Sequence, residues 1–320
     1  MIQARWSATE IIFWVACFAT VFLLPSRALL INEIAILGLF ALSLDLLLGY
    51  SGIVSLGHTA FFGLGAYAAG LLAKYGYGDP LLGLAAAALA AALLGFLTSF
   101  LVLRGSDLTR LMVTLGIASM LYELANQMAL VTGGADGMQG IAVKPLLGVF
   151  EFDFYGKTAA LYSLTTLFVL FLGARRLVNS PFGLSLKALR DNSLRAVSIG
   201  VPVNRRLVAV YTLAAAYAGI AGALLTQTTQ FASLDGLDFH RSADVLLVLT
   251  LGGIGYLYGG LIGAVFFTVL HDRLSALTPQ YWEFWIGAVL MAFVLIGRER
   301  LTAWPVKFFR ALTGRPETLL

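Results

Sequence analysis

Long apolar runs, rather than alternating apolar and polar positions, fill most of this sequence. Runs with few charged side chains lie near residues 8–24, 28–49, 54–74, 81–103, 110–131, 157–178, 207–230 and 281–297. A helix of about 20 apolar residues spans the hydrocarbon layer of a bilayer, whereas the strands of a membrane barrel alternate in hydropathy. The pattern therefore predicts an all-α, polytopic membrane helix bundle.

The apolar segment 243–271 has a different pattern, because its centre reads GGIGYLYGG. Glycine at this density breaks a helix, so we expect a broken hairpin of two short helices joined by a turn. Irregular backbone at membrane depth is buried in protein or lines a wet cavity. The break could form a gate or a purely structural hairpin. The candidate hinge or gate residues are Gly252, Gly253, Gly255, Gly259 and Gly260.

The distribution of Lys and Arg predicts how the chain crosses the membrane, because cytoplasmic loops carry an excess of both. With residues 179–206 in the cytoplasm and two crossings in 243–271, fifteen Lys and Arg fall inside and six outside. A single crossing by 243–271 would put the basic tail 298–320 outside. We therefore expect about 8–10 transmembrane segments, with ten crossings favoured, and both termini in the cytoplasm. Residues 1–320 would form one transmembrane domain.

Composition supports a membrane protein and offers no catalytic chemistry. The chain is 59% hydrophobic and 12% charged, with a mean hydropathy of +0.88. Cys17 is the single cysteine, which excludes an intrachain disulfide and a cysteine metal site. The GKT at 156–158 follows Glu151, where a phosphate-binding loop requires glycine. We expect no enzyme activity, cofactor, metal or nucleic-acid partner for this chain.

A polar stretch, residues 179–206, interrupts the apolar pattern with five Lys and Arg against one acid. Ser180 can cap a helix that begins at Pro181. A second short helix is expected from Ser193 to Ile199, capped by Asn192 or Ser193 and ended by Gly200. Two short amphipathic helices at the cytoplasmic membrane surface would follow. They could be an interfacial loop that only obeys the charge rule, or a docking surface for a cytoplasmic partner.

The run NSPFGLSLKALRDNSLRAVSIGVPVNR closely resembles the cytoplasmic coupling loop in the permease subunits of branched-chain amino acid ABC importers. Leu194 and Arg195 depart from the family's usual acidic and alanine residues. The residues that match the family's loop are Ser180, Pro181, Phe182, Gly183, Ala188, Arg190, Ala196 and Gly200.

Other stretches resemble the same family in the expected order. LLLGYSGIVSLGHTAFFGLGAY resembles its signature near the second and third spans, and TGGADG resembles an external loop. GALLTQTTQFASLDGLDF and LLVLTLGGIGYLYGGLIGA resemble its C-terminal block. The resemblance covers roughly residues 30–300. One departure is Ser119, where many relatives carry an acidic residue; Glu123 lies one turn later.

The resemblance implies a permease subunit of an ATP-driven importer in the bacterial inner membrane. Its implied partners are cytoplasmic ATPase subunits, a second permease subunit, a periplasmic solute-binding protein and the lipid bilayer. The implied solutes are branched-chain amino acids. The same architecture could carry urea, an amide or another small polar solute, and an ion-coupled secondary transporter is a further alternative.

Polar residues within the spans are candidates for the translocation path, because intramembrane polar groups are costly and usually face the interior. His58 and Asp45 could instead form structural hydrogen bonds between helices, and Glu123 could lie at a membrane interface. The candidate path residues are Asp45, Tyr50, His58, Glu123, Asn126 and Gln127.

The predicted topology puts Arg310 in the cytoplasm. In an Arg310→Cys variant that also carries Cys17→Ser, a membrane-impermeant maleimide added to intact cells should leave position 310 unlabelled. Lys144→Cys, on a predicted outer loop, is the matched control and should react. Labelling of position 310 from outside would overturn the ten-crossing arrangement.

Overall fold

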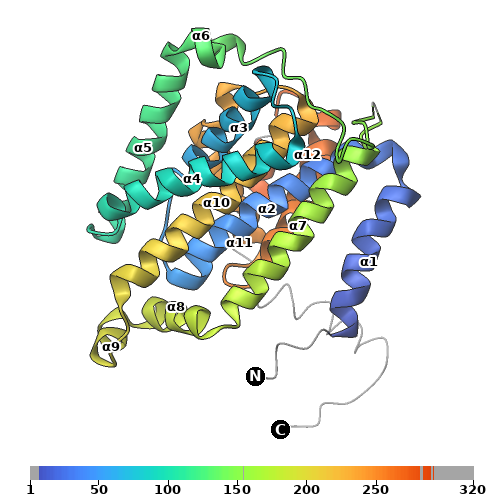
Figure 1. The fold of residues 1–320 in the computed structure, drawn as a ribbon. Helices are drawn as coiled ribbons and strands as arrows, with labels where there is room; N and C mark the ends of the chain where they lie inside the picture. Colours follow the sequence, from blue (N-terminus) through green and yellow to red (C-terminus); the bar gives the residue numbers. More distant parts are fainter. Residues whose placement is uncertain (1–6, 154, 282–283, 290, 292–320) are drawn as a thin grey trace, which may run out of the picture. The chain divides into compact units, whose positions relative to one another are not determined.

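Helix α2 (Ala28–Ser51) runs through the centre of a helical bundle (Figure 1). It packs against α7 (Lys157–Val178), α10 (Val203–Thr229) and α11 (Phe239–Gly252). A helix that is apolar on all faces is normally buried on all faces, and α2 is the most buried of the candidate spans. The computed structural model describes residues 7–153, 155–281, 284–289 and 291.

The chain divides into two compact units, residues 1–268 and residues 269–320. Helix α12 (Gly259–Leu277) begins in the first unit, and all contacts discussed below lie within that unit. Only residues 281, 284–289 and 291 of the predicted span 281–297 are described, with 284–289 helical. The predicted tail 298–320 lies outside the described residues.

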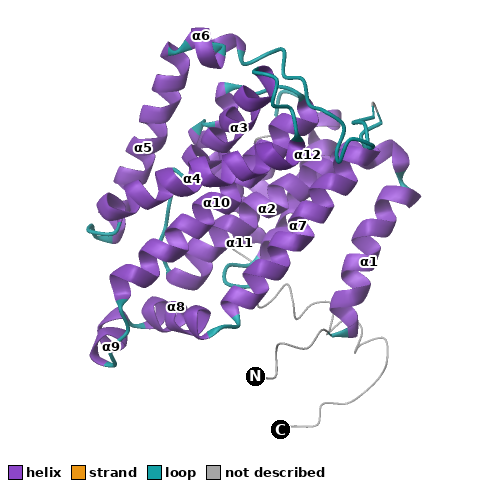
Figure 2. Cartoon of the chain, viewed as in Figure 1, coloured by secondary structure: helices purple, strands orange, loops and turns teal. Residues whose placement is uncertain are grey.

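The described residues form helices, short turns and two isolated β-bridges (Figure 2). Six helical segments are long and apolar enough to cross a membrane: Pro25–Ser51, Pro80–Val102, Asp107–Gln127, Lys157–Val178, Val203–Thr229 and Gly259–Leu277. They confirm the all-α membrane bundle that the apolar runs predict. The shorter elements are α1 (Ala8–Leu23), η2 (Pro25–Arg27), α3 (Thr59–Lys74), α6 (Ala129–Thr132), η3 (Gly134–Asp136), α8 (Pro181–Asp191), α9 (Ser193–Ser198) and η4 (Leu234–Gly236).

The break predicted within 243–271 is confirmed. Helix α11 ends at Gly252 and α12 begins at Gly259, with Gly253 and Gly255 at φ of 110° and 77° between them. A Cβ on Gly252 would overlap the carbonyl oxygen of Gly259. The glycines therefore let α11 and α12 approach closely, which supports a structural hairpin, and a gating role stays a prediction. Only α11 is short, because α12 has 19 residues and is itself a candidate span.

The predicted helix over 54–74 is wrong in its first turn, because helix α3 begins only at Thr59. Gly52 ends α2 in the left-handed region, at φ 74°, and a Cβ on Gly57 would overlap the carbonyl group of Thr114 on α5 (Asp107–Gln127). Residues 52–58 thus pass through the bundle as irregular backbone packed in protein. The apolar run did not indicate this irregular segment, since hydropathy alone does not separate a helix from a buried irregular segment.

Basic residues concentrate at one end of the bundle, which we call the α8 end. This end holds the connections 103–106, 179–202 and 253–258, and the opposite α6 end holds 75–79, 128–156 and 230–238 (Figure 1). Among the described residues of the first unit, the α8 end carries nine Lys and Arg: Arg104, Arg110, Arg175, Arg176, Lys187, Arg190, Arg195, Arg205 and Arg206. In the same described part of the chain, the α6 end carries five: Arg27, Lys74, Lys144, Lys157 and Arg241. The asymmetry agrees with a cytoplasmic α8 end, which stays a prediction.

Close contacts between backbones hold α10 against α3 and α4 (Pro80–Val102). A Cβ on Gly65 of α3 would overlap the backbone of Gly219 on α10, and a Cβ on Gly219 would approach the Ala87 carbonyl oxygen to 2.7 Å. Small residues allow such approach in lipid, where dispersion rather than the hydrophobic effect holds helices together.

Overpacking this contact should destabilise the bundle. We expect Gly219→Leu to lower the free energy of unfolding by at least about 1–3 kcal/mol and to lower the thermal melting temperature in detergent. Gly116→Leu on α5 is the matched control, because apart from the neighbouring backbone of α5 itself no atom lies within 4 Å of the place its Cβ would take. Equal melting temperatures for the two variants would contradict this packing.

Candidate functional site

The polar interruption folds into two short helices, as the sequence predicts. Ser180 accepts a hydrogen bond from the Gly183 N–H at 3.4 Å and Pro181 is the first residue of α8. Asn192 accepts one from the Arg195 N–H at 2.9 Å and caps α9. Each helix has its own N-terminal cap, so the loop is folded into two defined helices.

Gly200 ends α9 in the way its position predicts. Its φ is 85°, its N–H donates to the Val197 carbonyl, and the Val201 N–H donates to the Ala196 carbonyl. These two bonds define a Schellman motif, which requires a left-handed residue and favours glycine. The constraint on Gly200 is conformational, since no atom lies within 4 Å of the place a Cβ would take.

Helix α8 is fixed to the bundle through Arg190. Its Nη1 donates to the Gly49 carbonyl in the last turns of α2, and its Nε and Nη2 donate to Asp191 Oδ1 at 3.2 Å. A Cβ on Gly52, which ends α2, would lie 3.0 Å from the Arg190 Cγ. Gly52 therefore leaves room at the end of α2 for an arginine that belongs to the interrupting loop.

The turn between α11 and α12 also contacts α2 and Arg190. Asp45 of α2 is fully buried, and its Oδ1 accepts the Gly255 N–H at 2.7 Å. A Cβ on Gly255 would lie 3.1 Å from Arg190 Nη1. Arg190, Gly49, Asp45 and Gly255 thus form one contact group, which we call the Arg190 junction. It joins α8, α2 and the turn 253–258.

Two cation–π contacts support the junction. The Lys187 ammonium lies 5.4 Å from the centroid of the Tyr50 ring, and the Arg206 guanidinium lies 5.1 Å from that of Phe182. Both separations are within the range of an attractive contact. Two residues of α8, Lys187 and Phe182, thereby contact the end of α2 and the start of α10.

The small residues of the loop that match the family pattern lie at packing contacts. Gly183 is buried, and a Cβ there would overlap the Val178 carbonyl at the end of α7. Ala196 is the buried residue of α9, and Ala188 is half-buried on α8. Small side chains at these positions let the loop lie close to the bundle.

The candidate path residues fall into separate groups. Asp45 and Tyr50 belong to the α8 end, while Glu123, Asn126 and Gln127 lie in the last turns of α5 at the α6 end. Glu123 accepts a hydrogen bond from Gln127 at 2.8 Å, and both side chains are exposed. The structure does not bring the two groups together, and their role in a path stays a prediction.

His58 is fully buried beside Ser43, with 2.9 Å between Nε2 and the serine Oγ, and its ring stacks on Phe40. Hydrogen bonding and stacking between helices match the structural interpretation of His58 given above. Thr59 and Ser242 make a similar bond of 2.9 Å between α3 and α11.

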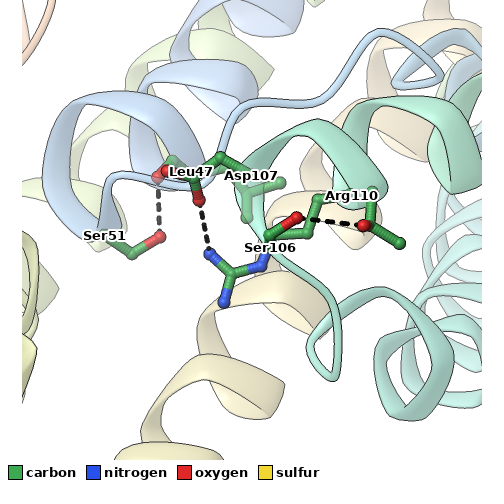
Figure 3. A network of polar contacts seen from close by, with 6 residues as sticks. Leu47, Ser51, Ser106, Asp107 and Arg110 are labelled. Atoms are coloured by element: carbon green, nitrogen blue, oxygen red, sulfur yellow. Dashed lines mark hydrogen bonds and ion pairs between the residues drawn. The ribbon is translucent and has the colours of Figure 1, made fainter.

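The sequence alone does not identify the partners at the α8 end. Gly49 stands four residues after Asp45 on one face of α2, a spacing that hints at a shared contact surface. Ser51 donates to the Leu47 carbonyl at 2.6 Å, and Arg110 pairs with Asp107 at 3.0 Å close to this helix end (Figure 3). These two pairs stand at helical spacing, whereas the contacts of Arg190 with Gly49 and of Asp45 with Gly255 do not follow from the order of residues.

The fold and this basic, loop-bearing end define a polytopic helical membrane protein. The family model "Branched-chain amino acid transport system / permease component" matches residues 26–294, and the chain belongs to that family.

Curated relatives include the high-affinity branched-chain amino acid transport system permease protein LivM of Salmonella typhimurium and of Escherichia coli K12. Each is 31% identical over 290 residues, covering 82% of this chain and 66% of the relative. The chain thus spans just under two thirds of their length. The autoinducer 2 import system permease protein LsrC of Enterobacter sp. is 30% identical over 274 residues, covering 81% of this chain and 74% of the relative. No solved structure matches the chain.

The hydrogen bond between Asp45 and Gly255 should contribute measurably to the free energy of unfolding. Asp45→Leu removes the acceptor, leaves the Gly255 N–H unpaired, and should lower the free energy of unfolding by about 1–3 kcal/mol. Asp45→Asn keeps an oxygen acceptor and should melt closer to the unmodified protein. If thermal melts of the purified chain show the Leu and Asn variants to be equally stable, the bond does not hold the turn.

Proposed function

We propose that this chain is a transmembrane permease subunit of an ATP-driven ABC importer in the bacterial inner membrane. It acts with cytoplasmic ATPase subunits, a second permease subunit and a periplasmic solute-binding protein. Membership of the permease family and the six long apolar helices support this proposal.

The observation that carries the proposal is the Arg190 junction. A force applied to α8 passes through Arg190 to the Gly49 carbonyl of α2, and next to it Asp45 joins α2 to the turn 253–258. Movement of an ATPase that grips the loop therefore reaches two parts of the bundle at once. The two bundle packings of a transporter need differ by only a few kcal/mol, so a small displacement suffices to switch them.

Helix α9 offers the ATPase a surface. Its apolar side chains Leu194 and Val197 are 81% and 57% exposed, and Ile199, which follows its last residue, is 72% exposed. Arg195 adds a positive charge beside them. Exposed apolar residues with a basic neighbour suit insertion into a groove of a cytoplasmic partner.

The proposed solutes are branched-chain amino acids. The names of the LivM relatives support this choice, and the name of the LsrC relative keeps another small polar solute as the second candidate. In such a system the binding protein selects the solute. Mass spectrometry of the ligand carried by the co-purified binding protein would decide, with leucine, isoleucine or valine expected and any other solute class contradicting the choice.

The alternative, an ion-coupled secondary transporter, would draw its energy from an ion gradient rather than from ATP. Uptake into cells by the importer should fall with depletion of ATP or inhibition by vanadate. Uptake that survives vanadate but collapses with an uncoupler would reject the ATP-driven proposal.

Two substitutions should uncouple transport while leaving the protein in the membrane. Gly200→Pro is incompatible with a φ of 85° and removes the N–H that donates to Val197. Arg190→Glu removes the donor to the Gly49 carbonyl. We expect radiolabelled leucine uptake to fall at least about tenfold, in line with the loss of one or two kcal/mol of coupling.

Gly200→Asn is the matched control for Gly200→Pro, because asparagine tolerates the left-handed region. It should retain most of the uptake, with equal amounts of every variant in the membrane by immunoblot. Normal uptake by both Gly200→Pro and Arg190→Glu would defeat the proposed coupling loop.

A further inference from the structure

A groove of about 790 Å³ lies at the α8 end and is shared by α9 and the bundle. Leu194 and Val197 of α9 form part of its lining, and so do Asp107 and Arg110 in the first turn of α5 and Arg205 at the start of α10. Figure 3 shows Arg110 beside the last turn of α2, with its guanidinium bonded to Asp107. The exposed apolar side chains of α9 therefore border on basic side chains that belong to the bundle.

The lining of the groove carries a positive charge. Arg110, Arg190 and Arg205 line it, and Asp107 is the single acid among its lining residues. Arg190 is bonded within the Arg190 junction, and Arg110 bonds to Asp107 through Nη1 at 3.0 Å. Arg205 is exposed and forms no hydrogen bond or ion pair with the residues that the structure describes. Guanidinium donors therefore remain for an acceptor from outside the chain.

A partner that covers α9 must also meet this charge. Because Leu194 and Val197 line the groove, a protein surface packed on them lies over its arginines as well. A guanidinium that loses water without gaining an acceptor is costly, and a carboxylate matches its planar fork with two parallel hydrogen bonds. The surface that fits here has carboxylate oxygens opposite Arg110 and Arg205 and apolar side chains opposite α9.

We propose that the ATPase subunit that holds α9 inserts an acidic segment into this groove, with an aspartate or glutamate carboxylate paired to Arg110 and Arg205. An apolar side chain of the same segment packs against Leu194 and Val197. This inference rests on the proposed function, because it assigns a chemistry to the partner named there. It gives the ATPase a second attachment, directly on α5 and α10, beside the attachment of α8 at the Arg190 junction.

An acidic protein segment fits the groove better than a free anion does. Inorganic phosphate would use the arginines alone, whereas the lining also contains apolar side chains of α9 and of α10, among them Val203. Complementary charge at an interface also selects the partner and makes the association dependent on salt. Free phosphate is the competing occupant, and its binding has a different experimental result.

Carbodiimide cross-linking of native membranes tests the pairing, because the reagent joins an amine to a carboxylate that contacts it. Arg205→Lys places an amine in the groove. Arg176→Lys is the matched control, since Arg176 is exposed at the same end of the bundle but does not line the groove. Mass spectrometry should find position 205 joined to an aspartate or glutamate of the ATPase subunit, and position 176 should not be joined to it.

Removal of the charge should weaken the same complex. In the double variant Arg110→Gln with Arg205→Gln, the affinity of the tagged chain for the ATPase subunit should fall on the order of tenfold. Added salt should release the ATPase from the unmodified chain and should change its release from the double variant less. Arg110→Lys with Arg205→Lys keeps both charges and should retain most of the affinity. Equal melting temperatures of the purified variants would show that all of them fold.

A photo-crosslinking amino acid at Leu194 separates this inference from the proposed function. If it captures the ATPase while position 205 joins no carboxylate of that subunit, or while position 176 joins it equally, the acidic segment is wrong and the proposed function stands. If neither Leu194 nor position 205 reaches an ATPase, both are wrong. Unchanged ATPase affinity in the double glutamine variant would overturn the inference. So would loss of the cross-link at position 205 in millimolar phosphate but not in chloride of equal ionic strength, since the groove would then hold a free anion.

Discussion

Backbone groups that leave a helix inside a membrane protein need partners there, and the Arg190 junction meets that need at the α8 end. Arg190 occupies the Gly49 carbonyl of α2, and Asp45 accepts the N–H of Gly255 in the turn between α11 and α12. Because Asp45 is fully buried, loss of its bond to the Gly255 N–H would be costly. The broken hairpin, the end of α2 and the first interrupting helix therefore depend on one another.

Much of this arrangement is predictable from local sequence. Ser180 before Pro181, Asn192 before Ser193, and Gly200 after Ser198 mark helix ends by capping chemistry that acts within a few residues. The glycines at 252–260 break the apolar run for the same local reason. The irregular segment 52–58 is different, because its backbone is held by Thr114 of a distant helix and its composition resembles that of a span.

The contacts of the candidate residues are not predictable in this way. Asp45 and Gly255 are 210 residues apart, and only the fold brings the carboxylate to the turn. The sequence leaves His58 open as a path residue or a structural one; the structure places it against Ser43 and Phe40, and a role in a path stays a prediction. The glycines at 49 and 52 show no chemistry of their own. Gly49 leaves space for Asp45 and Gly255, and Gly52 leaves space for Arg190. Family membership supports the transport system that the resemblance of the coupling loop implies.

The central claim is that α8 and α9 are held by a nucleotide-hydrolysing partner at the cytoplasmic face. The most direct measurement introduces a photo-crosslinking amino acid at Leu194, which is 81% exposed on α9, and identifies the crosslinked protein from native membranes by mass spectrometry. The account predicts capture of an ATPase subunit, and the same amino acid at Leu147, on the opposite end of the bundle, should not capture it. Capture of the ATPase from Leu147 but not from Leu194, or of no ATPase at either position, would contradict the account.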